Sequence, residues 1–234
     1  MSQVRGPISA SFPSDREART DVTDSPVVAL DDITVRAGAS TILRGVDLVV
    51  APGEAVGVFG SNGAGKTTLL RVVATLWEPS SGTGAVFGTD IAGPGRYDVR
   101  FRIGMIGHIP ALYPELTLRE NLRFVARVRG IDDGEVDRVL TAVGLANAAD
   151  RKVVDCSHGM QRRSEFAREM MLEPDLLLLD EPHAALDPSA VELVNHLAAR
   201  VTARRGAVLI VSHDLERAGD VVSRTERIEG GRFA

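Results

Sequence analysis

The segment with the strongest structural meaning in this sequence is a glycine-rich loop, Gly60-Ser61-Asn62-Gly63-Ala64-Gly65-Lys66-Thr67-Thr68. It matches the pattern GxxxxGK[ST], follows an apolar run typical of a buried strand (residues 55–59), and precedes apolar residues at helical spacing (68–76). In this order, backbone N–H groups and the positive end of a helix dipole surround a phosphate. The segment therefore predicts a nucleoside triphosphate site, in which Lys66 contacts the β- and γ-phosphates and Thr67 offers its hydroxyl to Mg²⁺.

Composition narrows the class of protein further. A chain of 234 residues with 44% hydrophobic content is long enough for one core domain with a smaller lobe. The formal net charge of −5 predicts no broad attraction for nucleic acid or anionic lipid. No apolar run approaches the roughly 20 residues that cross a bilayer, and the N-terminus lacks the order of a secretory signal. We expect a cytoplasmic protein that binds no nucleic acid and meets a membrane only through a partner.

One domain boundary follows from composition and turn signals. Residues 1–26 mix Ser, Asp, Arg, Thr and Pro without period, which predicts a disordered N-terminal tail. Residues 27–234 form the expected folded domain. Its short β-rich runs before the glycine loop predict an antiparallel β lobe, and the Gly- and Pro-rich residues 79–96 predict further hairpins.

A helical lobe is expected at about residues 110–165. Thr117 and Glu120 have capping-box spacing at the start of a helix that should run to about Arg129. Apolar residues at 136, 139, 140 and 143 then predict a second amphipathic helix, with Gly144 placed to end it.

Two carboxylates follow the apolar run at residues 176–179, which is typical of a strand buried on both faces of a parallel sheet. Asp180 and Glu181 would therefore emerge at the sheet edge where α/β proteins bind ligands. Asp180 suits Mg²⁺ and Glu181 suits the orientation of an attacking water, whereas the alternative is a strand that ends in solvated acids. His213 ends another expected strand (207–211), where an isolated histidine is more often structural than catalytic.

These motifs, in this order, resemble the ATP-binding cassette (ABC) family of ATPases over residues 27–234. The resemblance implies an α/β P-loop NTPase fold, with a mainly parallel sheet flanked by helices, an antiparallel β lobe and an inserted helical lobe. It implies Lys66 and Thr67 as Walker A residues, Asp180 as the Walker B aspartate and Glu181 as the catalytic base. Asp187 would be the D-loop aspartate and His213 the switch histidine. It also implies ATP and Mg²⁺ as ligands and a second cassette that completes each ATP site.

The family's signature motif LSGGQ departs from its usual form and reads here Cys156-Ser157-His158-Gly159-Met160, followed by Gln161. Ser157 keeps a hydroxyl for the partner's γ-phosphate, and Gly159 permits close approach of the backbone at a helix N-terminus. His158 and Met160 either weaken the pairing of two cassettes or add a contact. This motif and residues 106–122 are similar to the haem-exporter ATPase of cytochrome c maturation and related small export cassettes.

Two further positions depart from the family pattern. His108 stands where most cassettes have a glutamine near Mg²⁺, which predicts weaker or pH-dependent metal coupling. Ala37 stands in the stretch where the family has an aromatic residue that stacks on adenine, so GTP could be accepted beside ATP.

The sequence therefore predicts the ATP-hydrolysing subunit of an ABC transporter, which drives export of haem or another apolar substrate through a separate integral membrane permease at the inner face of the membrane. One alternative is a soluble ABC protein that acts on nucleic acid or ribosomes. A second alternative is a regulatory cassette with low turnover, because His108, His158, Met160 and Ala37 depart from the pattern together.

Overall fold

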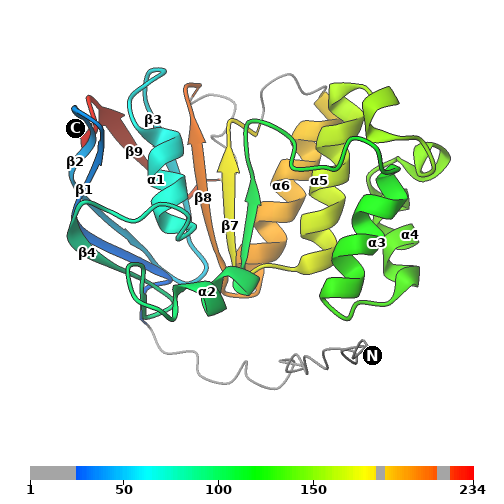
Figure 1. The fold of residues 1–234 in the computed structure, drawn as a ribbon, viewed down its shortest axis with the longest axis horizontal. Coiled ribbons are helices and arrows are strands. Elements are labelled where there is room, and N and C mark those ends of the chain that lie inside the picture. Colours follow the sequence, from blue (N-terminus) through cyan, green and yellow to red (C-terminus); the bar gives the residue numbers. More distant parts are fainter. Residues whose placement is uncertain (1–24, 183–187, 215–221) are drawn as a thin grey trace, which may run out of the picture.

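The structure is a computed structural model of the chain and describes residues 25–182, 188–214 and 222–234. Nearly all of the expected N-terminal tail lies outside these residues, as does Asp187. Two sheets and the helices around them make up the described fold (Figure 1). Across these ranges, none of the helices combines the length and the apolar character that a membrane crossing requires.

The larger sheet has six strands in the order β10-β9-β3-β8-β7-β6. Its parallel members are β3 (Ala55–Phe59), β6 (Ile103–Ile106), β7 (Leu176–Asp180), β8 (Ala207–Ser212) and β9 (Arg224–Glu229), and β10 (Arg232–Phe233) joins β9 in antiparallel register. Every residue of β3, β7 and β8 is buried. The mainly parallel sheet predicted from the sequence is confirmed.

The smaller sheet is antiparallel, in the order β2-β1-β4-β5. Its strands are β1 (Val28–Ala37), β2 (Ser40–Val50), β4 (Ser81–Val86) and β5 (Thr89–Asp90). This confirms the β lobe. The hairpin region expected at residues 79–96 contains β4 and β5, and a short helix, α2 (Arg96–Val99), begins at its end and is followed by a 3₁₀ turn at Arg100–Arg102.

The parallel sheet separates two hydrophobic cores because successive side chains of a strand point to opposite faces. Leu176 and Leu178 of β7 pack into a core shared with helix α1 (Lys66–Val73) and the antiparallel sheet. Leu177 and Leu179 pack on the opposite face against the helices. In Figure 1 the antiparallel sheet lies to the left of the parallel sheet, and α3 and α4 lie to its right. The continuous leucine run of β7 therefore has apolar neighbours on both faces.

The remaining helices are α3 (Leu118–Val128), α4 (Asp133–Ala142), α5 (His158–Leu172) and α6 (Pro188–Ala203), with 3₁₀ turns at Ala146–Ala148 and Val153–Asp155. The capping box at the start of α3 is confirmed, since Thr117 accepts a hydrogen bond from the Glu120 N–H and the Glu120 side chain accepts one from the Thr117 N–H. Gly144 follows α4 with a φ of +73°, as a helix-ending glycine should.

Helix α1 differs from the expected range of 68–76. It begins at Lys66, because Gly65 takes the N-cap position, and it ends at Val73. Thr75 has a φ of +59°, and Leu76 is 59% exposed. Apolar residues therefore keep helical spacing up to residue 76, although the helix itself ends at Val73.

Candidate nucleotide-hydrolysis site

The glycine loop joins β3 to α1 and lies against β9, which is close to the C-terminus of the chain. A Cβ atom at Gly60 would come within 2.2 Å of the Ile228 carbonyl oxygen of β9, and Gly65 has a φ of +104°. A side chain at Gly65 would also meet Leu43 of β2 at 2.7 Å. Glycine is therefore required at both positions, and the loop is held between the parallel sheet and the β lobe with its N–H groups at the start of α1.

Lys66 is a buried cation, only 6% exposed, at the first position of α1. Its Nζ donates hydrogen bonds to the carbonyl oxygens of Gly60 (2.7 Å) and Ser61 (3.1 Å), and it lies 3.6 Å from Oε1 of Glu181. The ammonium group is thus held over its own loop by oxygens that a phosphate can replace. This is the arrangement in which a lysine supplies positive charge to a transferring phosphoryl group.

Thr67 and Asp180 lie in direct contact, since the Thr67 hydroxyl donates to Oδ2 of Asp180 at 2.9 Å. Asp180 is 2% exposed, and burial raises its pKa, while the Thr67 hydrogen bond and the charges of His108 and Lys66 act in the opposite direction. The two oxygens suit Mg²⁺, which takes few protein ligands and completes its shell with water and phosphate oxygens. Within the described ranges, no group of three or more His, Cys, Asp or Glu residues forms a metal site by itself.

Glu181 has its backbone in the left-handed region, with a φ of +49°. Its Oε2 accepts a hydrogen bond from the Ser212 hydroxyl (3.0 Å) and lies 2.9 Å from Nδ1 of His213. The two carboxylates therefore have different partners, and their separate roles stay predictions. Ser212 was not predicted as a site residue, and only its position next to His213 at the end of β8 could have indicated it.

The signature segment lies at the start of α5, where Ser157 is the N-cap and its side chain accepts a hydrogen bond from the Met160 N–H. Ser157 and His158 are exposed, and Gly159, Met160 and Gln161 are partly buried. The Gln161 amide donates to the carbonyls of Val153 and Cys156, so it holds the preceding turn. Contact of this segment with a second chain stays a prediction.

His108 is exposed in the loop that follows β6, and its charge acts on Asp180. Ala37 is exposed at the end of β1. The place of His108 beside a metal stays a prediction, as do the effects of both residues on nucleotide or metal preference.

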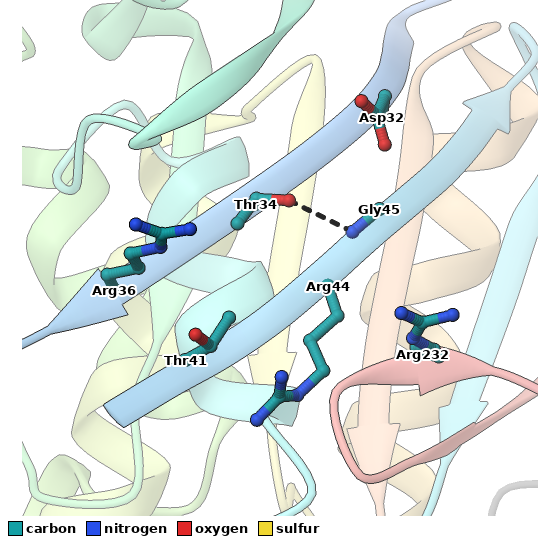
Figure 2. Close-up of a pocket in the computed structure, with 7 residues that line it drawn as sticks. All are labelled: Asp32, Thr34, Arg36, Thr41, Arg44, Gly45 and Arg232. Carbon is teal, nitrogen blue, oxygen red and sulfur yellow. Dashed lines mark hydrogen bonds between the residues drawn. The ribbon is translucent and has the colours of Figure 1, made fainter. Parts of the chain in front are cut away.

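A cavity of about 390 Å³ lies away from these groups, over the antiparallel sheet and β10. Figure 2 shows side chains from β1, β2 and β10 around it, including the hydrogen bond from the Gly45 N–H to the Thr34 hydroxyl. Its lining residues are Asp32, Thr34, Arg36, Thr41, Arg44, Gly45 and Arg232. None of them was predicted as a site residue, and the phosphate loop contributes nothing to this cavity.

Strand β3, the glycine loop, the buried lysine at the start of α1 and the Thr67–Asp180 pair define a P-loop nucleoside triphosphatase. A sequence model described as ABC transporter matches residues 43–184. The chain therefore belongs to the ABC transporter family and is its ATP-binding, ATP-hydrolysing subunit.

Individual relatives agree with this family assignment. The chain is 36% identical over 213 residues to Nod factor export ATP-binding protein I of Burkholderia lata, covering 88% of this chain and 70% of the relative. It is 41% identical over 182 residues to aliphatic sulfonates import ATP-binding protein SsuB 2 of Burkholderia cenocepacia, covering 77% and 66%. A solved ATP-binding subunit of an ABC transporter superposes with a TM-score of 0.80 at 30% identity, covering 88% of each chain. The chain spans about two thirds of the length of the two curated relatives.

Proposed function

We propose that this chain is the motor subunit of an exporter, and that it couples Mg²⁺-dependent ATP hydrolysis to conformational change in a separate integral membrane permease. The observation that carries the proposal is the fixed position of Glu181. One of its carboxylate oxygens is held by Ser212 and His213, while the other lies 3.6 Å from Lys66 at the phosphate loop.

The proposed chemistry divides the work among separate groups. Thr67 and Asp180 would hold Mg²⁺, which supplies charge that stabilises the phosphate oxygens. Lys66 and the N–H groups of the glycine loop bind and orient the phosphates. Glu181 orients the attacking water, accepts a hydrogen bond from it and takes its proton as a general base, and His213 holds the Glu181 carboxylate toward that water.

Export rather than import is the proposed direction. The Nod factor export relative covers more of this chain than the sulfonate import relative, although the import relative has the higher identity. The signature segment and residues 106–122 favour an apolar cargo, because they are similar to haem-exporter and related small export cassettes. Haem or another apolar molecule is therefore the proposed substrate class.

The permease would bind the helical lobe, proposed at about residues 110–165. A cavity of about 210 Å³ opens between the loop after β6, α3 and α5, and it is lined by Ala111, Leu112, Tyr113, Asn121, Leu122, Phe124, Val125 and Arg168. Tyr113 and Phe124 are 57% and 49% exposed, and their rings meet edge to face. Such an exposed apolar groove suits a short amphipathic helix of a partner. This contact would hold the subunit at the cytoplasmic face of the membrane.

A second cassette would complete each ATP site, with Ser157 of the signature segment facing the partner's nucleotide. The rival proposal is a regulatory cassette with low turnover, and the observation that favours it is the pair of exposed or partly exposed substitutions His158 and Met160 at the start of α5.

Phosphate release from MgATP, measured for the purified chain alone and with the permease encoded beside it, tests the proposal. If the chain is the motor subunit, it should hydrolyse ATP, the permease should stimulate this hydrolysis, and Glu181→Gln should abolish it. ATP binding without turnover in both settings would favour the regulatory cassette. Vesicle uptake of haem, with a sulfonate as the competing cargo, tests the direction and substrate.

A further inference from the structure

Helix α5 carries a set of buried charged side chains that the nucleotide chemistry does not use. Arg162 is 2% exposed, Glu165 is 0% exposed and Glu169 is 1% exposed. Charged residues are almost never buried to this extent unless they are paired. These residues lie on the helix that begins at the signature segment, so their partners show which parts of the domain are tied to that helix.

Arg162 joins three elements through one guanidinium group. Its Nη1 donates to the Gly107 carbonyl in the loop after β6, and its Nη2 donates to the Asp180 carbonyl at 3.2 Å. Nη1 also lies 3.2 Å from Oε2 of Glu165, one turn further along α5. The carbonyl of the proposed metal-binding residue and the carbonyl that precedes His108 are therefore bound to the same side chain.

Glu165 and Arg168 extend this connection along the loop after β6. Oε1 of Glu165 accepts a hydrogen bond from the Ala111 N–H at 2.9 Å. Arg168 donates to the carbonyls of Met105 (2.9 Å) and Ala111 (3.3 Å). The loop that holds His108 is thus bound to α5 at both of its ends.

The planar guanidinium fork makes the connection at Arg162 sensitive to geometry. Its donors have fixed directions, so the Asp180 carbonyl, the Gly107 carbonyl and Glu165 can all accept from its two Nη groups only in one relative arrangement. Stability alone gives little reason for such a group, because replacing a buried ion pair with well-packed apolar residues is often neutral or stabilising.

We propose that Arg162 is a positioning residue that makes the signature helix and the His108 loop respond to the nucleotide state at Asp180. It touches no nucleotide and acts through the Asp180 and Gly107 carbonyls. The proposal rests on the proposed function, because it needs ATP to bind beside Asp180, but it does not need rapid turnover.

Hydrogen exchange of the full-length chain with and without MgATP tests this coupling. The test variant is Arg162→Gln with Glu165→Gln, which removes both charges and leaves no unpaired buried ion. Arg138→Gln with Glu135→Gln is the matched control, because it removes an i,i+3 pair of the same chemistry from the solvent-facing side of α4. In wild type we expect MgATP to slow exchange in the phosphate loop, in residues 107–111 and at the start of α5. In the double variant we expect protection of the phosphate loop alone.

Kinetics add a measurement that a merely structural role would not reproduce. We expect KM for MgATP to stay within about 2-fold and kcat to fall about 10- to 100-fold, since small misplacement of reacting groups has effects of this size. The Arg162→Lys variant should show the same low kcat as the double variant, because one ammonium group cannot replace the two guanidinium donors that bind the Gly107 and Asp180 carbonyls.

Two results would overturn the proposal: protection at residues 107–111 that persists in the double variant, or wild-type protection confined to the phosphate loop. Absence of turnover in wild type would contradict the proposed function instead, and the exchange experiment would still decide the role of Arg162.

Discussion

Lys66 and Arg162 are both buried cations next to the end of β7, yet their surroundings differ in kind. Lys66 contacts two carbonyls of its own loop and the Glu181 carboxylate, at the place where the phosphates must bind. Arg162 contacts carbonyls of two other elements and a fully buried glutamate. The first cation can exchange its partners for a ligand, whereas the second cannot leave its partners without uncovering buried polar groups. Lys66 is therefore a cation that can bind a ligand, and Arg162 is a cation that holds the loop after β6, the end of β7 and α5 in one arrangement.

Removing Arg162 should have the largest effect on stability. Arg162→Leu would leave Glu165 buried without its closest cation, and breaking a buried pair in this way costs about 3–5 kcal/mol. Urea unfolding of the nucleotide-free chain would measure this loss. Arg162→Leu with Glu165→Leu should recover most of it, and equal losses in the single and double variants would contradict the role assigned to the pair.

Removing Lys66 should have the opposite result: a small change in stability and a large loss of ATP affinity. Lys66→Ala deletes contacts to its own loop, so the free energy of unfolding should change by about 1 kcal/mol or less. Its charge-assisted hydrogen bonds to phosphate are worth about 1.5–3 kcal/mol, so ATP affinity should fall by about 10- to 100-fold. Titration with a fluorescent ATP analogue would measure the loss. A large loss of stability with unchanged affinity would erase the distinction between Lys66 and Arg162.

A third prediction concerns the pH dependence of stability that the buried Glu169 of α5 creates. Burial raises the pKa of Glu169 above 4.5, although the charge of Arg168 acts to lower it, so the native state holds this proton more tightly than the unfolded chain. The free energy of unfolding should therefore fall as pH rises from about 4.5 through the raised native pKa, by about 1.4 kcal/mol for each unit between the two values. Urea unfolding across this range should show a flatter profile for Glu169→Gln, and an unchanged profile for Glu229→Gln, which alters an exposed glutamate. A Glu169→Gln profile that matches wild type would contradict this assignment.

The phosphate-binding region around Lys66 could be predicted from the sequence because its signals are local. Strand β3, the glycine loop and α1 follow one another along the chain, and the leucine run of β7 shows its burial directly. Capping residues gave the start of α3 for the same reason. The end of α1 was missed because helical spacing continues through Thr75, whose backbone leaves the helix.

The buried charge network of α5 could not be predicted from the sequence, because the partners of its residues are distant in sequence. Arg162, Glu165 and Glu169 look like a solvated helix face when read along the chain, and it is the packing of α5 against β6 and the neighbouring helices α3, α4 and α6 that buries them. The closeness of Gly60 to Ile228 and of Ser212 to Glu181 likewise depends on the order of strands in the sheet. The conformation of Glu181, with a φ of +49°, has no signal in the residue type.

The most direct test of the account compares wild type with Glu181→Gln under single-turnover conditions with MgATP, with ATP binding measured in parallel. Because Glu181 is assigned to the attacking water and Lys66 to the phosphates, the variant should bind ATP within about 3-fold of wild type and hydrolyse it at least about 100-fold more slowly. Equal hydrolysis by the two proteins would contradict the assignment of Glu181 and, with it, the proposed division of work at the site.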